Sequence, residues 1–277
     1  MEKFTILTSI YNCGKFIDSY FKTIFTQIIL PQEIILINDG NNPKNLIGLI
    51  KNIKKEYNFE NIILIENKKN LGLGPSLNIG LKKITNNLIF RLDVDDLWLP
   101  NHTQKMLNLY NQDINCAIYA ESVKKLSLKN MIKCDNFLIN ENSTIHSSWL
   151  INRNVSQKFR YHLLNPKIAL EDYFTLFWHQ HYGYRLKISY EHITTIYNNT
   201  PGSLGKKYAE NYYYLRNRKR ISIFFFKNNL KNKNIFYQLF FILFKFNLLR
   251  MTVFLFWIQD IAKIKFFIKK LFKRNFS

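Results

Sequence analysis

The first hundred residues alternate between short apolar runs and longer stretches in which apolar residues recur every three or four positions. The short runs are rich in Ile, Leu and Phe and end in polar residues, which is typical of strands buried on both faces of a sheet. The longer stretches have the period of an amphipathic helix. We therefore predict strands at residues 3–12, 33–40, 61–67 and 87–96, and helices at residues 14–27, 45–58 and 74–84.

This alternation of strands and helices predicts an α/β fold with a mostly parallel, doubly wound sheet. Ligands of such sheets bind beyond the carboxyl ends of the strands. Polar residues stand at three of these predicted ends: Asn12, Asp39 and the acidic run Asp93–Asp96. Their placement is the first indication of a functional site.

The segment "NLGLGPSLNIG" (70–80) follows a predicted strand and opens a helix, as a dinucleotide-binding fingerprint does. Gly72 and Gly74 fit the first two glycines of that motif, but the next glycine is Gly80, three positions too late. The spacing argues against a Rossmann dehydrogenase. A helix start rich in small residues still favours phosphate or a sugar hydroxyl as a ligand.

The stretch "LIFRLDVDDLWLP" (88–100) places Asp93, Asp95 and Asp96 within four positions of a chain whose net charge is +21. Carboxylates so close repel one another unless a cation or hydrogen-bond donors balance them. Two readings stand: a solvated acidic turn, or a site for a hard cation such as Mg²⁺ or Mn²⁺. Arg91 would either serve the site or offset its charge.

Most of the positive charge lies near the C-terminal end. From residue 206 onward there are seventeen Lys or Arg residues against Glu210 and Asp260, interleaved with Phe, Leu, Ile and Trp. Lys245 and Arg250 interrupt the most apolar window, so an interfacial membrane helix is favoured over a spanning one. A core-packing helical subdomain and nucleic-acid binding are the alternatives.

Six segments, in this order and rough spacing, resemble a bacterial family 2 glycosyltransferase: "TILTSIYN", "ILINDG", "NLGLGPSLNIGL", "FRLDVDD", "HSSWLINR" and "ALEDYFTLFWH". The resemblance implies a GT-A fold, a Rossmann-like, mostly parallel sheet with flanking helices, in residues 1–205. Residues 206–277 would form a basic, aromatic-rich helical segment that associates with a membrane. The chain has no QxxRW motif, so a non-processive transferase is expected.

The resemblance also implies which residues hold a nucleotide-sugar donor. They are Thr8, Tyr11, Asp39, Asn78, Arg91 and Asp93. Thr8 and Tyr11 would contact base and ribose, and Asp39 would bond the imino group of a uracil. The family's usual acidic pair before Gly40 is here Asn38-Asp39, which is a departure.

The same resemblance implies the metal site and the catalytic base. Asp95 would be the main Mn²⁺ or Mg²⁺ ligand, with Asp93 near the ribose and also serving as a ligand, and Asp96 in support. Asp172 would accept the proton of the acceptor hydroxyl, with Glu171 beside it, which predicts inversion of configuration. Without the family, residues 169–181 are an amphipathic helix with an acidic first turn.

The expected partners are a nucleotide-sugar donor, probed first as UDP, a saccharide or glycolipid acceptor, and a membrane surface, with no nucleic acid. Three unpaired-looking cysteines and no signal peptide predict a cytoplasmic protein, peripheral on the inner face of the membrane. Two rival hypotheses are a sugar nucleotidyltransferase and a non-enzymatic membrane or nucleic-acid adaptor. Zinc at the HxH of His179 and His181 is disfavoured, because a helix turns these rings to different faces.

Overall fold

The computed structural model describes residues 2–40, 45–122, 144–161, 171–172, 175–176, 179, 182–190 and 192–198. All of them belong to Met1–Leu204, the first of the two units into which the chain divides. The predicted basic segment at 206–277, and with it the division into two domains, lies outside the described residues. Among the described residues, no helix is long and apolar enough to cross a membrane.

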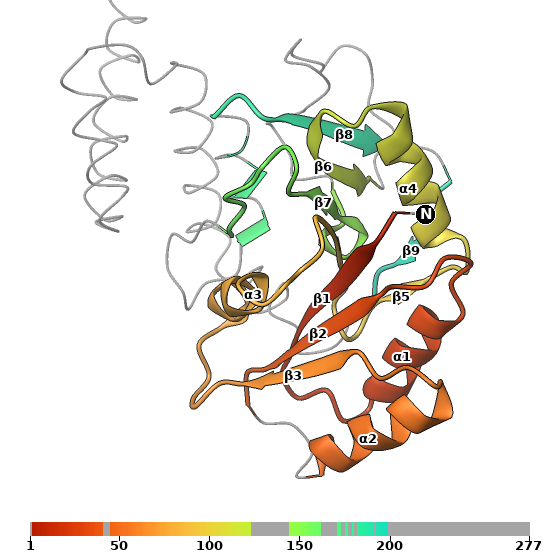
Figure 1. Ribbon diagram of the computed structural model, residues 1–277, viewed down its shortest axis with the longest axis vertical. Helices are drawn as coiled ribbons and strands as arrows, with labels where there is room; N and C mark the ends of the chain where they lie inside the picture. Colours follow the sequence, from red (N-terminus) through yellow and green to blue (C-terminus); the bar gives the residue numbers. More distant parts are fainter. Residues whose placement is uncertain are drawn as a thin grey trace, which may run out of the picture. The chain divides into compact units, whose positions relative to one another are not determined.

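The described residues form a mixed sheet of seven strands in the order β3-β2-β1-β4-β7-β6-β8 (Figure 1). The strands are β1 (Phe4–Ile10), β2 (Glu33–Asn38), β3 (Ile62–Glu66), β4 (Leu88–Arg91), β6 (Cys116–Glu121), β7 (Leu150–Asn152) and β8 (Arg185–Ser189). The first four are mutually parallel, as predicted. β7 is antiparallel to β4 and to β6, so β6 again runs in the direction of β4.

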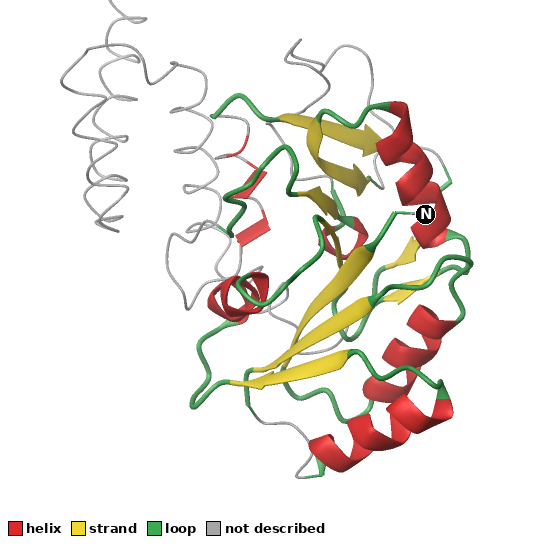
Figure 2. Ribbon diagram, in the orientation of Figure 1, coloured by secondary structure: helices red, strands yellow, loops and turns green. Residues whose placement is uncertain are grey.

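A second, two-stranded sheet pairs β5 (Leu97–Trp98) with β9 (Thr195–Ile196). Four α-helices are described: α1 (Ile17–Phe25), α2 (Leu46–Glu56), α3 (Leu73–Leu81) and α4 (His102–Gln112). A short 3-10 turn, His146–Ser148, precedes β7. Figure 2 shows helices and strands alternating through the N-terminal part, which confirms the predicted order of elements.

Both faces of the central strands are covered by helices. Phe4 and Ile6 of β1 pack into one core with apolar residues of α1, α2 and α4. Leu7, which points to the other face, lies against α3. This burial on two faces explains why the strands read as nearly continuous apolar runs rather than alternating ones.

Gly80 permits the close contact between α3 and the sheet. A Cβ atom at this position would lie 2.5 Å from Leu7 Cδ1 and 2.6 Å from Ile37 Cδ1. A residue with a side chain would therefore have to displace the ends of these two buried side chains or push the helix away from β1 and β2. The last glycine of the sequence motif thus serves helix–sheet packing rather than a dinucleotide.

Gly80→Val should lower the free energy of unfolding by about 1–3 kcal/mol, the usual effect of overpacking a dense interior. Lys82→Val, an exposed position at the end of the same helix, is the matched control and should change stability little. Urea denaturation followed by circular dichroism measures both. A Gly80→Val protein as stable as the control would contradict the close packing of α3.

Candidate active site

The carboxyl ends of β1, β2 and β4 bring the predicted polar residues to one edge of the sheet. Tyr11 follows β1 and is 52% exposed, whereas Asp39 follows β2 and is buried. The acidic turn, Asp93–Asp96, follows β4. Because the three strands are parallel neighbours, these residues share one edge, as the sequence predicts.

A buried ion pair lies at the base of the acidic turn. Arg91, the last residue of β4, is fully buried and donates hydrogen bonds from its guanidinium to Asp93 Oδ1 and to the carbonyl of Leu92. Burial, the largest single effect, would raise the pKa of Asp93, but the charge of Arg91 acts together with hydrogen bonds from Arg91 and Ser147 to lower that pKa. Asp93 is therefore ionised at neutral pH, and its charge is offset from below by Arg91.

Ser147 joins two carboxylates of the turn. Its hydroxyl lies 3.1 Å from Asp93 Oδ2 and also contacts Asp96 Oδ2, and it accepts a hydrogen bond from the backbone N–H of Asp93 at 3.1 Å. A hydroxyl carries one proton, so it can donate to only one of the two carboxylates. Burial and the charge of Asp93 raise the pKa of Asp96 to about 7. Near neutral pH the Asp96 carboxyl therefore carries a proton part of the time and can then donate to the Ser147 hydroxyl.

The backbone N–H of Asn198 donates to Asp96 Oδ1 at 2.8 Å. Asp96 thus has donors on both oxygens and is buried, whereas Asp95 is partly exposed. Asp95 and Asp93, both partly exposed, are the members of the turn that can meet a ligand at the surface.

A second group of residues lies beside this turn and includes Glu171. The imidazole Nε2 of His146 lies 3.2 Å from the hydroxyl of Tyr161, and its Nδ1 lies 3.9 Å from Glu171 Oε1. Burial, reinforced by the charge of Arg91, lowers the pKa of His146 to about 3. The ring is therefore neutral at pH 7, and Glu171 faces a polar but uncharged partner.

Asp172 belongs to the same neighbourhood as the acidic turn. Burial is the largest cause of the raised pKa of Tyr161 and of Tyr197, and the charges of Asp93 and Asp172 raise both further. The acidic turn and Asp172 therefore both lie within electrostatic range of Tyr161 and Tyr197. The described residues of the predicted helix 169–181, namely 171–172, 175–176 and 179, are helical.

Three predicted donor-binding residues make hydrogen bonds inside the protein. Thr8 is buried, donates to the carbonyl of Leu92 at 2.8 Å and accepts from the hydroxyl of Tyr20 at 2.8 Å. Asn78 exchanges two hydrogen bonds with the backbone of Tyr161, at 2.8 and 3.0 Å. These hydrogen bonds hold Thr8 and Asn78 in place at the carboxyl edge of the sheet.

The third, Asp39, accepts hydrogen bonds from the backbone N–H groups of Leu71 and Gly72, each at 2.8 Å, and from the side chain of Asn67 at 2.8 Å. Gly72 has a φ of +91°, a conformation that favours glycine, and it precedes the first turn of α3. The carboxylate of Asp39 thus holds the loop that leads into this helix.

No role was expected from the sequence for Tyr161, for Tyr197 or for the backbone N–H of Asn198, and Ser147 stood out only as part of the family-like segment "HSSWLINR". The signal available for Ser147 was its segment "HSSW". The backbone N–H of Asn198 could not be recognised from the sequence, because every residue except proline has one. Contacts of this kind depend on residues that lie far apart along the chain.

A hard divalent cation fits part of this arrangement. The described residues contain no cluster of three or more His, Cys, Asp or Glu side chains with metal-binding geometry. Mg²⁺ and Mn²⁺ sites that serve phosphate substrates need only one or two protein carboxylates, since the phosphates complete the coordination. The partly exposed Asp95, with Asp93 beside it, satisfies that requirement.

Comparison with known proteins identifies the family. A model of glycosyl transferase family 2 matches residues 5–174, more than half of the chain, and the chain therefore belongs to this family. The match confirms the resemblance seen in the sequence and disfavours the nucleotidyltransferase and adaptor hypotheses.

Two curated relatives carry more specific names. The amylovoran biosynthesis glycosyltransferase AmsE of Erwinia amylovora is 32% identical over 107 residues, which cover 38% of this chain and 39% of that protein. The UDP-Gal:alpha-D-GlcNAc-diphosphoundecaprenol beta-1,3-galactosyltransferase of Escherichia coli is 28% identical over 125 residues, 44% of each chain. Each match thus spans less than half of the relative's length.

Solved structures of low sequence identity share the fold. TarS of S. aureus, residues 1–349 with UDP-GlcNAc, gives a TM-score of 0.57 at 16% identity, covering 80% of this chain and 66% of that one. A mannosyltransferase of Pyrobaculum calidifontis with GDP-Man and Mn²⁺ gives 0.56 at 12% identity, covering 79% and 61%. These likenesses confirm the GT-A fold.

The neutral state of His146 makes stability depend on pH. Its folded pKa of about 3 lies below its ordinary value of 6.5, so the unfolded chain binds a proton that the folded protein does not. The stability is complete above pH 6.5 and falls by about 1.4 kcal/mol per pH unit below it through this group. His146→Gln should remove that share of the slope between pH 6.5 and 4.5.

Urea denaturation at several pH values, with wild type and variant at the same ionic strength, measures this difference. Subtracting the two curves cancels the contributions of the other titrating groups. A His146→Gln protein that keeps the wild-type slope would show that the imidazole is protonated in the folded state.

Proposed function

We propose that this protein is an inverting, non-processive glycosyltransferase that moves one sugar from a uridine diphosphate-sugar to a saccharide or glycolipid acceptor. The observation that carries the proposal is that the acidic turn and Asp172 both lie within electrostatic range of Tyr161 and Tyr197, whose pKa both charges raise. Membership of glycosyl transferase family 2 supports the reaction class. The names of the Escherichia coli relative, a UDP-Gal transferase, and of the TarS complex with UDP-GlcNAc support a uridine nucleotide.

The donor would lie along the carboxyl edge of the sheet. Tyr11 offers an exposed ring for the base, and Asp39 lines the same edge at the end of β2. The diphosphate would lie over the acidic turn, with Asp95 and Asp93 holding Mn²⁺ or Mg²⁺ between the carboxylates and the phosphates. The cation would supply charge neutralisation for the leaving nucleoside diphosphate.

Asp172 would act as the general base. Its carboxylate accepts the proton of the acceptor hydroxyl while that oxygen forms a bond to the anomeric carbon. The bond from the anomeric carbon to the diphosphate oxygen breaks on the opposite face, and its electron pair leaves with the nucleoside diphosphate. Configuration at the anomeric carbon is thereby inverted.

Glu171 would orient this base rather than act as one. It is buried, 5% exposed, and lies near the neutral ring of His146 and the charge of Arg91. Asp172, the next residue, is partly exposed and can therefore reach an acceptor.

The acceptor is the least constrained part of the proposal. The seventeen cations of residues 206–277 support docking to an anionic membrane surface, which places a lipid-linked acceptor within reach. The Escherichia coli relative, whose name specifies a diphosphoundecaprenol-linked acceptor, supports a lipid-linked acceptor as well. An enzyme so placed would work peripherally on the cytoplasmic face of the membrane.

The donor site is tested by thermal shift with UDP, GDP, dTDP and CMP, each with Mn²⁺, Mg²⁺ or EDTA. UDP at one hundred times its own dissociation constant, with a divalent cation present, should stabilise the fold by about 2.7 kcal/mol. EDTA should abolish this rise in melting temperature. Asp95→Asn should lose the shift, because it removes the partly exposed carboxylate of the turn.

Asp113→Asn is the matched control, since Asp113, at the end of α4, pairs with Arg185, the first residue of β8, and lies outside the acidic turn. It should keep the full response to UDP. If no nucleotide shifts the melting temperature with or without metal, the proposed donor site is wrong.

Asp172→Asn should reduce sugar transfer at least ~10²-fold, the typical effect of removing a general base. Binding of UDP with Mn²⁺ should survive, because Asp172 contacts the acceptor rather than the donor in this proposal. Transfer is measured as UDP released in the presence of acceptor. Turnover within about tenfold of wild type would exclude Asp172 as the base.

A further inference from the structure

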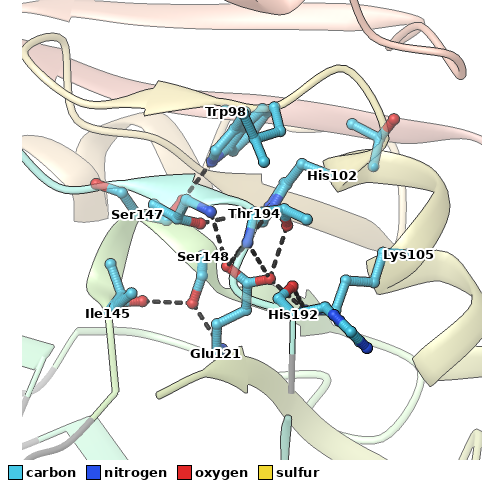
Figure 3. Close-up of polar contacts among 12 residues, drawn as sticks. Trp98, His102, Lys105, Glu121, Ile145, Ser147, Ser148, His192 and Thr194 are labelled. Atoms are coloured by element: carbon cyan, nitrogen blue, oxygen red, sulfur yellow. Dashed lines mark hydrogen bonds and ion pairs between the residues drawn. The ribbon is translucent and has the colours of Figure 1, made fainter. Parts of the chain in front are cut away.

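Glu121, the last residue of β6, is a buried carboxylate that the proposed chemistry does not use. It is 0% exposed and lies at the same edge of the sheet as the acidic turn, because β6 runs in the direction of β4. Figure 3 shows its carboxylate among the side chains of Lys105, His102 and Thr194. A buried carboxylate is tolerated only where donors satisfy it, so these contacts indicate a specific role.

The carboxylate binds one cation and one segment of backbone. Lys105 Nζ of α4 lies 2.6 Å from Oε1, and the hydroxyl of Thr194 donates to the same oxygen at 2.7 Å. The backbone N–H groups of Thr194 and Thr195 donate at 3.0 Å each. Glu121 therefore fixes the backbone immediately before and within β9.

The charges around Glu121 are consistent with an ionised carboxylate. Burial by itself would raise its pKa, but the neighbouring His102 ring and the hydrogen bonds from Lys105 and Thr194 lower it. Burial lowers the pKa of His102 to about 3, so that ring is neutral and Lys105 supplies the opposing charge. The hydroxyl of Thr194 lies 2.8 Å from His102 Nδ1 and links the two.

One path leads from Glu121 through residues 194–198 to Asp96. The carbonyl of Thr194 accepts from the N–H of Leu99 at 2.7 Å, and Ile196 of β9 pairs with Leu97 of β5. Two residues after Ile196, the N–H of Asn198 donates to Asp96. The segment held by Glu121 thus supplies a hydrogen bond inside the acidic turn.

A second path leads through the turn 145–148 to the same carboxylate. The N–H of Glu121 donates to Ser148 Oγ at 2.8 Å, and its carbonyl accepts from the N–H of Ile145 at 2.9 Å. Ser147 lies between these two residues, and its hydroxyl contacts Asp96. Both donors to Asp96 therefore stand on segments bonded to Glu121: Asn198 on the segment held by its carboxylate, and Ser147 on the turn held by its backbone.

We propose that Glu121 is a positioning residue for the acidic turn, holding Ser147 and Asn198 in register so that the turn is shaped to receive a metal-bound diphosphate. The inference rests on the proposed function, because it assigns the donor to that turn. Glu121 touches neither donor nor acceptor. It acts through the two segments that it joins, and it is a buried acid outside the family-like segments of the sequence.

Glu121→Gln tests this assignment, because glutamine keeps the shape but loses the charge and one acceptor oxygen. Hydrogen exchange in residues 192–198 should accelerate at least about tenfold, whereas exchange in β1 and β2 stays at the wild-type rate. The dissociation constant for UDP with Mn²⁺ should rise at least about tenfold, since a displacement of 1 Å at a site can cost ~10²-fold. Isothermal titration calorimetry measures that constant.

Glu33→Gln is the matched control. Glu33 is a strand residue, 3% exposed, whose carboxylate accepts from the hydroxyl of Thr5 at 2.6 Å. It stands at the first position of β2, the end opposite to the acidic turn. Glu33→Gln should lower the melting temperature yet leave the affinity for UDP with Mn²⁺ unchanged, which separates positioning from general stability.

Thr194→Val is the milder variant if Glu121→Gln does not fold, since it removes only the hydroxyl that Glu121 and His102 share. It should loosen 192–198 and weaken UDP binding in the same direction. Wild-type affinity for UDP with Mn²⁺ in a folded Glu121→Gln protein, or in Thr194→Val where that variant stands in for it, overturns the inference. If the wild type itself binds no nucleotide, the proposed function fails first.

Discussion

The acidic turn depends on the buried ion pair between Arg91 and Asp93. A guanidinium loses its hydration when it enters a core, and only a carboxylate in close contact offsets that loss. β4 ends at Arg91, so the cation lies beneath the turn while Asp93 and Asp95 stay partly exposed. A basic protein can therefore concentrate three carboxylates in four positions, because one of them is neutralised from within.

The other two acids of the turn are handled differently. Asp96 is buried and receives hydrogen bonds from Ser147 and from the backbone of Asn198, two residues that come from distant parts of the chain. Asp95 stays partly exposed. The turn thus combines a carboxylate paired with Arg91, a partly exposed one and a buried one, and this difference in environment gives three identical side chains three different properties.

Local patterns were enough to predict the first four strands and three helices, because burial on two faces and helical periodicity are both visible within a short window of sequence. β6, β7 and β8 were not predicted. β7 has three residues, and its pairing with β4 joins positions about sixty apart along the chain, which no local window contains. Arg91 illustrates the same limit within the site: the sequence left open whether it serves a ligand or offsets charge, and no local pattern indicated that it is fully buried against Asp93.

Asp39 shows how such a contact changes the chemistry of the whole edge. Small residues at the start of α3 favour anion binding in sequence, yet the N–H groups of Leu71 and Gly72 are already bonded to the carboxylate of Asp39. An internal anion thus takes the place that a phosphate would take at that helix start. For a nucleotide diphosphate donor, neutralisation then falls to the acidic turn, where carboxylates alone would repel phosphate. A cation between the two is the arrangement that removes this repulsion, which is why the donor and the metal belong to one site in the proposed reaction.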